Sequence, residues 1–469
     1  MDDLLGSVAA LQEAYRRRRL SPVEVTRVLL DRAERLQPVL HAFITITAER
    51  ALAQARAAER RLLRGDAAPL LGVPITLKDL YDQRGVPTTA GSGMRRTAVA
   101  AADAPVVRRL FRAGAVSLGK TNTHEFAYGG SCINPHFGAV RNPWAPERIA
   151  GGSSGGAGTA VATGLGLVGM GSDTVGSIRV PAALCGVVGL KPTYGRVPTA
   201  GVFPLFPSLD HVGPLSRTVA DAAAVLQVIA SGSRADPTAA HRPRRDYLGT
   251  LGAGVAGMRV GVVVQHRDDV DGEILAAVDA AAGMLERLGA RVVPLEWPAL
   301  PPVDGLGAEA AATHRATLEA SPDGFGPDVR RRLEQGLAVR AVDYIAGLRT
   351  LRERRSRTEA LFRTASGERV HVLLGPTVSR TATRLDDPDG ALGWMSRFTR
   401  PYNETGLPAI SVPCGFTARG LPIGLQIASR PFAEAAVLRV AHAYEQATDW
   451  HRRRPTLLRG LAGTPAAVG

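Results

Sequence analysis

The chain has 469 residues, of which 45% are hydrophobic, and this is enough apolar material for a large buried core. The formal net charge is +14, but the arginines are scattered and their short clusters lack interleaved aromatic residues, so we expect no nucleic-acid partner. No apolar run is long enough to span a bilayer and no signal-peptide pattern is present, so we expect a cytoplasmic protein without membrane contact. Cys132, Cys185 and Cys414 are far apart in the chain, which predicts reduced thiols and no metal site.

Helices and strands alternate along the sequence, beginning with a helical segment at residues 1–65. Periodicity and capping residues predict further helices at residues 105–112, 216–231, 271–288 and 433–448, and a mostly helical stretch at 300–365. Short apolar or β-branched runs predict strands at residues 71–77, 115–118, 259–265, 291–295, 370–374, 409–413 and 423–427. This alternation indicates an α/β layer architecture. Strands resume on both sides of the one weak boundary, near 235–258, so we expect a single domain over residues 1–469.

The most unusual stretch is residues 151–196, which is rich in Gly, Ser and Thr and almost free of charge. A flexible linker could have this composition, but a linker has no reason to carry apolar runs such as residues 184–190. We therefore interpret the stretch as a buried, glycine-lined site where backbone N–H groups and hydroxyls converge on a ligand.

Several familiar motifs occur without the structural context that they need. Residues 114–121 fit the phosphate-loop pattern, and residues 164–169 and 252–257 fit the dinucleotide pattern, but none lies in the required strand–loop–helix order. Residues 151–155 fit the nucleophile elbow of α/β-hydrolases but follow a loop instead of a strand. We therefore expect no cofactor.

The remaining chemistry is that of hydroxyl groups. A tight turn before Ser177 could aim several N–H groups at one point and form an oxyanion hole. A serine nucleophile also needs a base, and no histidine lies in the glycine-rich stretch. Lys78 ends an apolar strand, where burial would lower its pKa and make it a base. The equally weighted alternative is a structural lysine that pairs with Asp79.

Four segments carry a resemblance to a known family. They are residues 74–79 (PITLKD), 151–156 (GGSSGG), 171–182 (GSDTVGSIRVPA) and 185–193 (CGVVGLKPT). Together the chain resembles the amidase signature family of serine hydrolases over most of residues 65–235 and again over 398–451. The resemblance implies a central mixed, twisted β-sheet flanked by α-helices. It divides the domain into a helical N-terminal segment (1–65), a signature core (66–235), a substrate-covering insertion (300–395) and C-terminal core strands with a helix (398–451).

The resemblance also implies roles for individual residues. Ser177 would be the nucleophile, Lys78 the general base, and Ser153, held through a cis peptide, would carry the proton between them. The oxyanion hole would be formed by Thr174, Val175, Gly176 and Ser177. Ser154, Asp173 and Arg179 would support the loop as a hydrogen-bonding scaffold.

Position 175 departs from the family pattern, which usually has glycine there. A β-branched residue nearly forbids positive φ. We therefore predict a negative φ at Val175, with the turn otherwise unchanged.

The substrate pocket is expected to be apolar and partly aromatic. Its predicted lining consists of Phe126, Tyr128, Gly129, Ile133, Phe203, Leu205 and Phe206, although ordinary core packing explains these residues equally well. An apolar pocket favours hydrophobic or aryl amides and anilides, with carbamates (a urethanase activity) or aryl esters as further candidates through the same acyl-enzyme. We expect such a small molecule to be the only partner of a monomer or homodimer.

Two alternatives remain. The chain also resembles the A subunits of tRNA-dependent amidotransferases, which release ammonia from glutamine for a tRNA-holding partner. Holding glutamine calls for a carboxylate near its ammonium group, expected just before Phe398 and Thr399, and residues 394–397 contain no acid. The other alternative is a non-catalytic scaffold, which the joint presence of Ser177, Ser153 and Lys78 argues against.

Overall fold

The computed structural model describes residues 6–243, 245–297, 301–387 and 393–457. Its centre is an eleven-stranded sheet in the order β1-β3-β2-β6-β8-β7-β12-β13-β11-β9-β10. The strands are β1 (Phe43–Ile46), β2 (Pro74–Lys78), β3 (Val116–Thr121), β6 (Val168–Asp173), β7 (Val188–Lys191), β8 (His211–Ser216), β9 (Arg259–Val263), β10 (Arg291–Leu295), β11 (Val372–Pro376), β12 (Ala409–Phe416) and β13 (Pro422–Ala428). A separate hairpin pairs β4 (Arg141–Asn142) with β5 (Ala145–Ile149).

The sheet is mixed, as expected. Strand β2 pairs in parallel with both β3 and β6, and β9 pairs in parallel with β10 and β11. The middle of the sheet is antiparallel, because β8 joins β6 to β7 and β12 joins β7 to β13. An α/β fold with a large mixed sheet is thereby confirmed.

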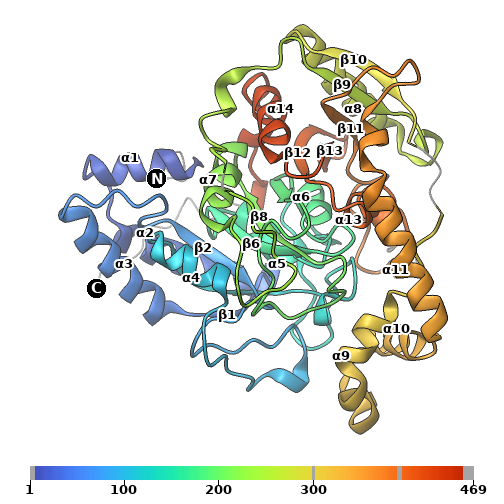
Figure 1. Cartoon of the computed structure of the whole chain (residues 1–469). Helices are drawn as coiled ribbons and strands as arrows, with labels where there is room; N and C mark the ends of the chain where they lie inside the picture. The colour runs from blue at the N-terminus through green and yellow to red at the C-terminus, as the bar shows by residue number, and fades with distance from the viewer. Residues whose placement is uncertain (1–5, 244, 298–300, 388–392, 458–469) are drawn as a thin grey trace.

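Helices flank this sheet and extend beyond both of its ends (Figure 1). They are α1 (Val8–Arg16), α2 (Pro22–Leu40), α3 (Ala48–Leu63), α4 (Pro105–Arg112), α5 (Gly155–Ala162), α6 (Arg179–Cys185), α7 (Val219–Ile229), α8 (Gly272–Arg287), α9 (Gly307–Ala320), α10 (Pro327–Leu337), α11 (Ala341–Ser356), α12 (Gly393–Ser396), α13 (Arg400–Glu404) and α14 (Glu434–Gln446). Helices α1 to α4 lie at one end of the molecule and α9 to α11 at the other.

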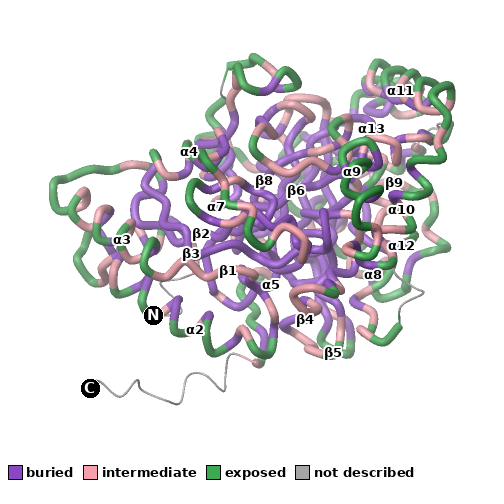
Figure 2. The backbone as a smooth tube through the Cα atoms, turned by 90° about the horizontal axis from the view of Figure 1, so that it is seen from below, coloured by how far each residue is buried: buried purple, intermediate pink, exposed green. Residues whose placement is uncertain are grey.

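Burial follows this layering. The central strands and the short helices α5 and α6 are buried, whereas the outer helices expose one face, as Figure 2 shows. Helix α2 begins where the sequence predicts: Ser21 and Glu24 form a reciprocal capping box and Pro22 is the first helical residue. No helix among the described residues is long and apolar enough to cross a membrane.

Two predictions of local structure were incomplete. The segment 1–65 is not wholly helical, because Phe43–Ile46 forms strand β1 and pairs with β3. The stretch 151–196 contains two strands, β6 and β7, which the sequence analysis did not predict. Both carry glycines and few β-branched residues, so propensity gives a weak signal, and their burial in the middle of the sheet determines their structure.

Candidate active site

Lys78 is the last residue of β2 and is fully buried. Its Nζ lies 2.7 Å from Ser153 Oγ and 2.9 Å from Ser172 Oγ. Asp79 is not its partner: the Asp79 carboxylate pairs with buried Lys120 at 2.9 Å. Pairing with Asp79, the structural alternative, is thus not observed, and within the described residues the hydrogen bonds of Lys78 go to hydroxyl groups. Burial lowers the pKa of Lys78 to about 7.

Ser153 lies in the loop before α5, and the peptide bond between Gly152 and Ser153 is cis. The Ser153 carbonyl accepts hydrogen bonds from Thr123 Oγ1 at 2.8 Å and from Cys132 Sγ at 3.0 Å. The next residue, Ser154, donates from Oγ to the Ser172 carbonyl at 3.2 Å. The loop is therefore tied to β6 and to the chain around Thr123, with the Ser153 hydroxyl directed at Lys78.

Ser177 lies in the turn between β6 and α6 and is 6% exposed. The Asp173 carboxylate organises this turn by accepting from the Gly176 N–H at 2.8 Å and the Ile178 N–H at 3.1 Å. The Gly176 N–H is thereby occupied. Within the described residues, the N–H groups of Val175 and Ser177 have no hydrogen-bond partner. The Val175 and Ser177 N–H groups are therefore better placed than that of Gly176 to bind an oxyanion, and the predicted set that also includes Thr174 stays a prediction.

Arg179, the first residue of α6, is completely buried and binds the carboxylate that organises this turn. It forms two 3.0 Å contacts with the Asp173 carboxylate. Its remaining donors reach the C-terminal part of the chain: the Thr399 carbonyl at 3.0 Å, Gln426 Oε1 at 2.7 Å and Asn403 Oδ1 at 2.6 Å. Burial alone would raise the pKa of Asp173, but the charge of Arg179 and the hydrogen bonds that Arg179 donates to the carboxylate hold that pKa well below its usual range.

Val175 has no positive φ, whereas Gly176 has φ 139°. The predicted negative φ at position 175 is therefore confirmed, and the altered residue does not strain the turn. The Val175 carbonyl accepts from Thr399 Oγ1 at 2.5 Å, which holds the backbone in place independently of the side chain.

We expect Val175→Gly to keep amide hydrolysis within about threefold of the native rate, since no steric strain is released. Steady-state kinetics on the purified variant would test this. A large gain in kcat would show instead that the valine side chain distorts the turn.

A cavity of about 190 Å³ opens onto Ser177. It is lined by Ala127, Tyr128, Gly129, Gly130, Gly152, Val175, Gly176, Ser177, Val180, Leu205, Phe206, Arg332, Met395 and Ser396. Most of these side chains are apolar, as the sequence predicts. Four predicted pocket residues belong to this lining: Tyr128, Gly129, Leu205 and Phe206.

The other three predicted pocket residues lie elsewhere. Phe126 packs in an aromatic cluster with His314 and Phe325, at centroid distances of 4.2 and 5.6 Å. Phe203 lines a second, smaller cavity and Ile133 packs against a separate apolar cluster. A large apolar side chain in a loop gives the same sequence signal in a core and in a pocket, so the sequence could not distinguish these three positions from the four that line the cavity.

Two contributions to the site were missed. Ser172, on β6, contacts the Lys78 amine, and its only sequence signal was its place directly before Asp173. Arg332, on α10, brings a guanidinium to the cavity wall. Its segment matches no motif, so no signal could have found it.

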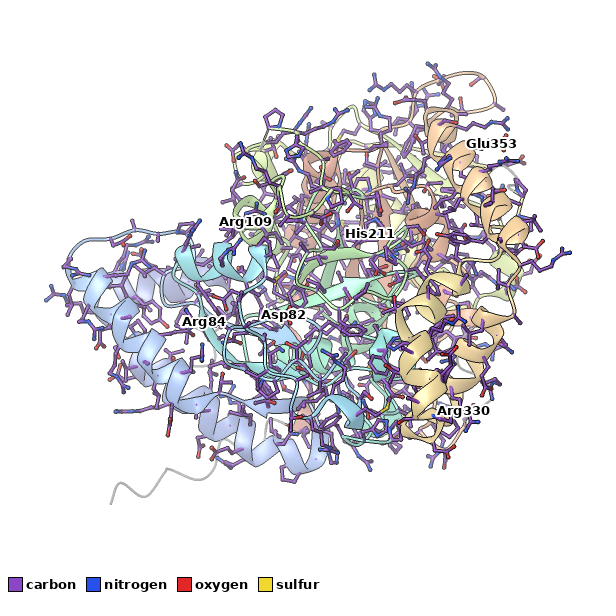
Figure 3. The ribbon with its side chains drawn as sticks, turned by 60° about the horizontal axis from the view of Figure 1, so that its bottom comes forward. Asp82, Arg84, Arg109, His211, Arg330 and Glu353 are labelled. Atoms are coloured by element: carbon purple, nitrogen blue, oxygen red, sulfur yellow. The ribbon has the colours of Figure 1, made fainter. Side chains whose placement is uncertain are left out.

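Arg332 is held by a short network at the cavity edge. Its Nη1 donates to the Tyr128 carbonyl and, at 2.8 Å, to Asp328 Oδ2. His124 Nε2 lies 3.0 Å from the same Asp328 oxygen. Nε and Nη2 of Arg332 have no partner in the part of the chain that is described. Arg330, two residues earlier, instead lies at the outer edge of the molecule, far from buried His211 (Figure 3).

If Lys78 is the base, kcat/KM should rise about tenfold per pH unit below about pH 7 and level off above it. The reason is that only the neutral amine accepts a proton, and the fraction of neutral lysine grows until the pH passes its pKa. A pH profile of kcat/KM measures this limb. A profile that is flat between about pH 5 and 9, or that falls with rising pH near 7, would contradict the assignment.

Comparison with known proteins places this fold and site in a family. The Amidase family profile matches residues 24–438. The chain belongs to this family, whose members act on amide C–N bonds.

Individual relatives within the family include A subunits of glutamyl-tRNA(Gln) amidotransferase. The chain is 42% identical to the A subunit of the glutamyl-tRNA(Gln) amidotransferase of Synechococcus sp. (strain WH7803), over 93% of this chain and 96% of that protein. The solved structure of the corresponding protein from Thermotoga maritima has a TM-score of 0.76 and 33% identity, covering 94% of each chain. A structure from a vestigial protein complex linked to the origins of an s-triazine catabolic enzyme has a TM-score of 0.87 and 34% identity, covering 94% of this chain and 98% of that one.

These relatives correct two predictions. Further relatives, from 36 to 42% identical over nearly the whole chain, are also named as A subunits of this amidotransferase. Hydrophobic or aryl amides and carbamates are therefore wrong as the favoured substrates, and the alternative is better supported. The expectation of a small-molecule partner alone, without nucleic acid, is wrong for the same reason.

Proposed function

We propose that this chain is the glutamine-hydrolysing A subunit of a tRNA-dependent amidotransferase. Two observations support the proposal. The buried Lys78 amine contacts Ser153, whose neighbour Gly152 lines the same cavity as Ser177, and the relatives named for this subunit match the chain over nearly their full length. The high positive charge of +14 is compatible with an assembly that holds tRNA.

The reaction begins at the side-chain carboxamide of glutamine. Ser177 Oγ attacks the carboxamide carbon while its proton passes through the Ser153 hydroxyl to neutral Lys78. The developing oxyanion accepts from the free N–H groups of Val175 and Ser177. Lys78 returns the proton through Ser153 to the nitrogen, the C–N bond breaks, and ammonia leaves for the tRNA-holding partner. Water then cleaves the glutamyl ester and regenerates Ser177.

Arg332 suits the α-carboxylate of this substrate. It is the only basic side chain that lines the cavity within the described residues, and two of its nitrogens are free to donate. A guanidinium in an apolar cavity binds a carboxylate through charge-assisted hydrogen bonds. Asp328 and Tyr128 fix the third nitrogen, which orients the other two.

The test is conversion of glutamine to glutamate by the purified protein, first by itself and then with the partner subunits and glutamyl-tRNA of its own source organism. We expect turnover in the assembly, lost when the protein carries Ser177→Ala and assembles equally well. Failure to hydrolyse glutamine in the complete assembly would overturn the proposal.

A further inference from the structure

Glutamine presents two charged groups to the site, an α-carboxylate and an α-ammonium, and the cavity treats them unequally. Arg332 offers a counter-charge to the carboxylate. The segment just before Phe398, where a counter-charge to the ammonium was expected, does reach the cavity wall, but through Met395 and Ser396. No carboxylate lines the cavity in the described ranges.

The acid in this region is already engaged. Asp328 Oδ2 contacts both Arg332 Nη1 and His124 Nε2. Burial alone would raise the pKa of Asp328, but the hydrogen bond from His124 and the charge of Arg332 hold it well below its usual range. Asp328 is therefore the counter-charge of the Arg332 guanidinium, and the Met395 and Ser396 side chains at the cavity wall carry no charge.

Desolvating an ammonium group without a counter-charge weakens binding, whereas a carboxylate opposite a guanidinium is compensated. An amide that keeps the carboxylate and lacks the amino group avoids this loss. Its carboxamide would still reach Ser177, because the carbon chain between the two ends is unchanged.

We propose that this site recognises its substrate by the carboxylate and not by the ammonium. The site therefore hydrolyses the ω-monoamide of a dicarboxylic acid at least as well as glutamine. The inference rests on the proposed glutamine hydrolysis and uses the same chemistry: the carboxamide C–N bond breaks, water supplies the oxygen, and ammonia leaves.

The test compares kcat/KM for three amides of equal chain length in the complete assembly with its tRNA. They are glutamine, 4-carbamoylbutanoate (no amino group) and 5-aminopentanamide (no carboxylate). We expect 4-carbamoylbutanoate to equal or exceed glutamine, and 5-aminopentanamide to fall at least about 100-fold below both. A preference for glutamine over 4-carbamoylbutanoate of more than about tenfold would overturn the inference.

Variants at Ser396 and Arg332 test which side chains determine the substrate preference. Ser396→Asp supplies the missing charge and should shift the ratio of kcat/KM values at least about tenfold toward glutamine, whereas the neutral control Ser396→Asn should not. Arg332→Met should lower kcat/KM for both carboxylates by at least about 100-fold and should not lower it for 5-aminopentanamide, whose terminal ammonium is repelled by the guanidinium. An unaltered ratio in Ser396→Asp would contradict the inference.

The two proposals fail separately. Turnover of glutamine without 4-carbamoylbutanoate overturns the inference and leaves the proposed function standing. Turnover of 4-carbamoylbutanoate without glutamine supports the inference and overturns the proposed function, and hydrolysis of none of the three overturns both.

Discussion

Ser177→Ala is expected to lower kcat for amide hydrolysis by about 10⁴-fold or more, the scale seen when a catalytic nucleophile is removed. The reason is that, in the proposed reaction, the acyl-enzyme requires the Ser177 oxygen, whereas Ser153 and Lys78 move its proton. The fold should persist, because the Ser177 hydroxyl has no hydrogen-bond partner among the described residues and the turn is held by Asp173. Steady-state ammonia release and thermal unfolding of the same preparation measure both effects.

Ser92→Ala is the matched control for this loss. Ser92 is also buried and its hydroxyl lacks a partner in the described structure, so the variant removes the same atom without touching Lys78, Ser153 or Ser177. It should retain near-native activity. Turnover by Ser177→Ala within about tenfold of the native chain would remove Ser177 from the role of nucleophile.

Arg179→Met is expected to lower the free energy of unfolding by about 3–5 kcal/mol, the cost of leaving one partner of a buried ion pair alone. The Asp173 carboxylate would remain buried without its counter-charge, and acceptors on Asn403, Gln426 and Thr399 would lose their donor. Because Asp173 also shapes the Ser177 turn, activity should fall together with stability. Denaturant unfolding measured beside kcat checks both.

Arg330→Met is the control, since Arg330 lies at the outer edge of the molecule (Figure 3) and pairs with exposed Asp323 and Glu334. A surface pair contributes little, because water screens both charges. If Arg179→Met unfolds within about 1 kcal/mol of the native chain, the Arg179 network does not hold the site together.

The residues proposed as catalytic could be singled out from the sequence because they lie in local motifs. Lys78 ends a short apolar strand, and Ser153 and Ser177 lie in glycine-rich turns whose composition is hard to explain otherwise. Parallel pairing of β2 with β6 then brings these segments together, although β3, β4 and β5 lie between the two strands in the chain.

The pocket could not be predicted to the same degree. Phe126 and Phe206 are both aromatic loop residues, yet only Phe206 lines the cavity, because packing against His314 draws Phe126 into the core. Arg332 comes from α10, about 150 residues after Ser177 in the chain. Tertiary contacts determine which residues line the cavity, and no local sequence pattern predicts these contacts.

The substrate prediction failed for a different reason. It gave decisive weight to the absence of an acid in residues 394–397, although the relatives match nearly the whole chain. The absence itself is real in the described cavity, where Met395 and Ser396 occupy the wall. It bears on which part of the substrate is recognised more than on which enzyme family performs the reaction.

The most direct test of the central claim follows the nitrogen atom. The chain, its partner subunits and glutamyl-tRNA would be incubated with glutamine labelled with ¹⁵N in the side-chain amide, and the aminoacyl group on the tRNA would be analysed by mass spectrometry. The proposed function predicts ¹⁵N-labelled glutaminyl-tRNA with the native chain and none with Ser177→Ala. Unlabelled tRNA with the native chain, in an assembly shown to contain all subunits, would contradict it.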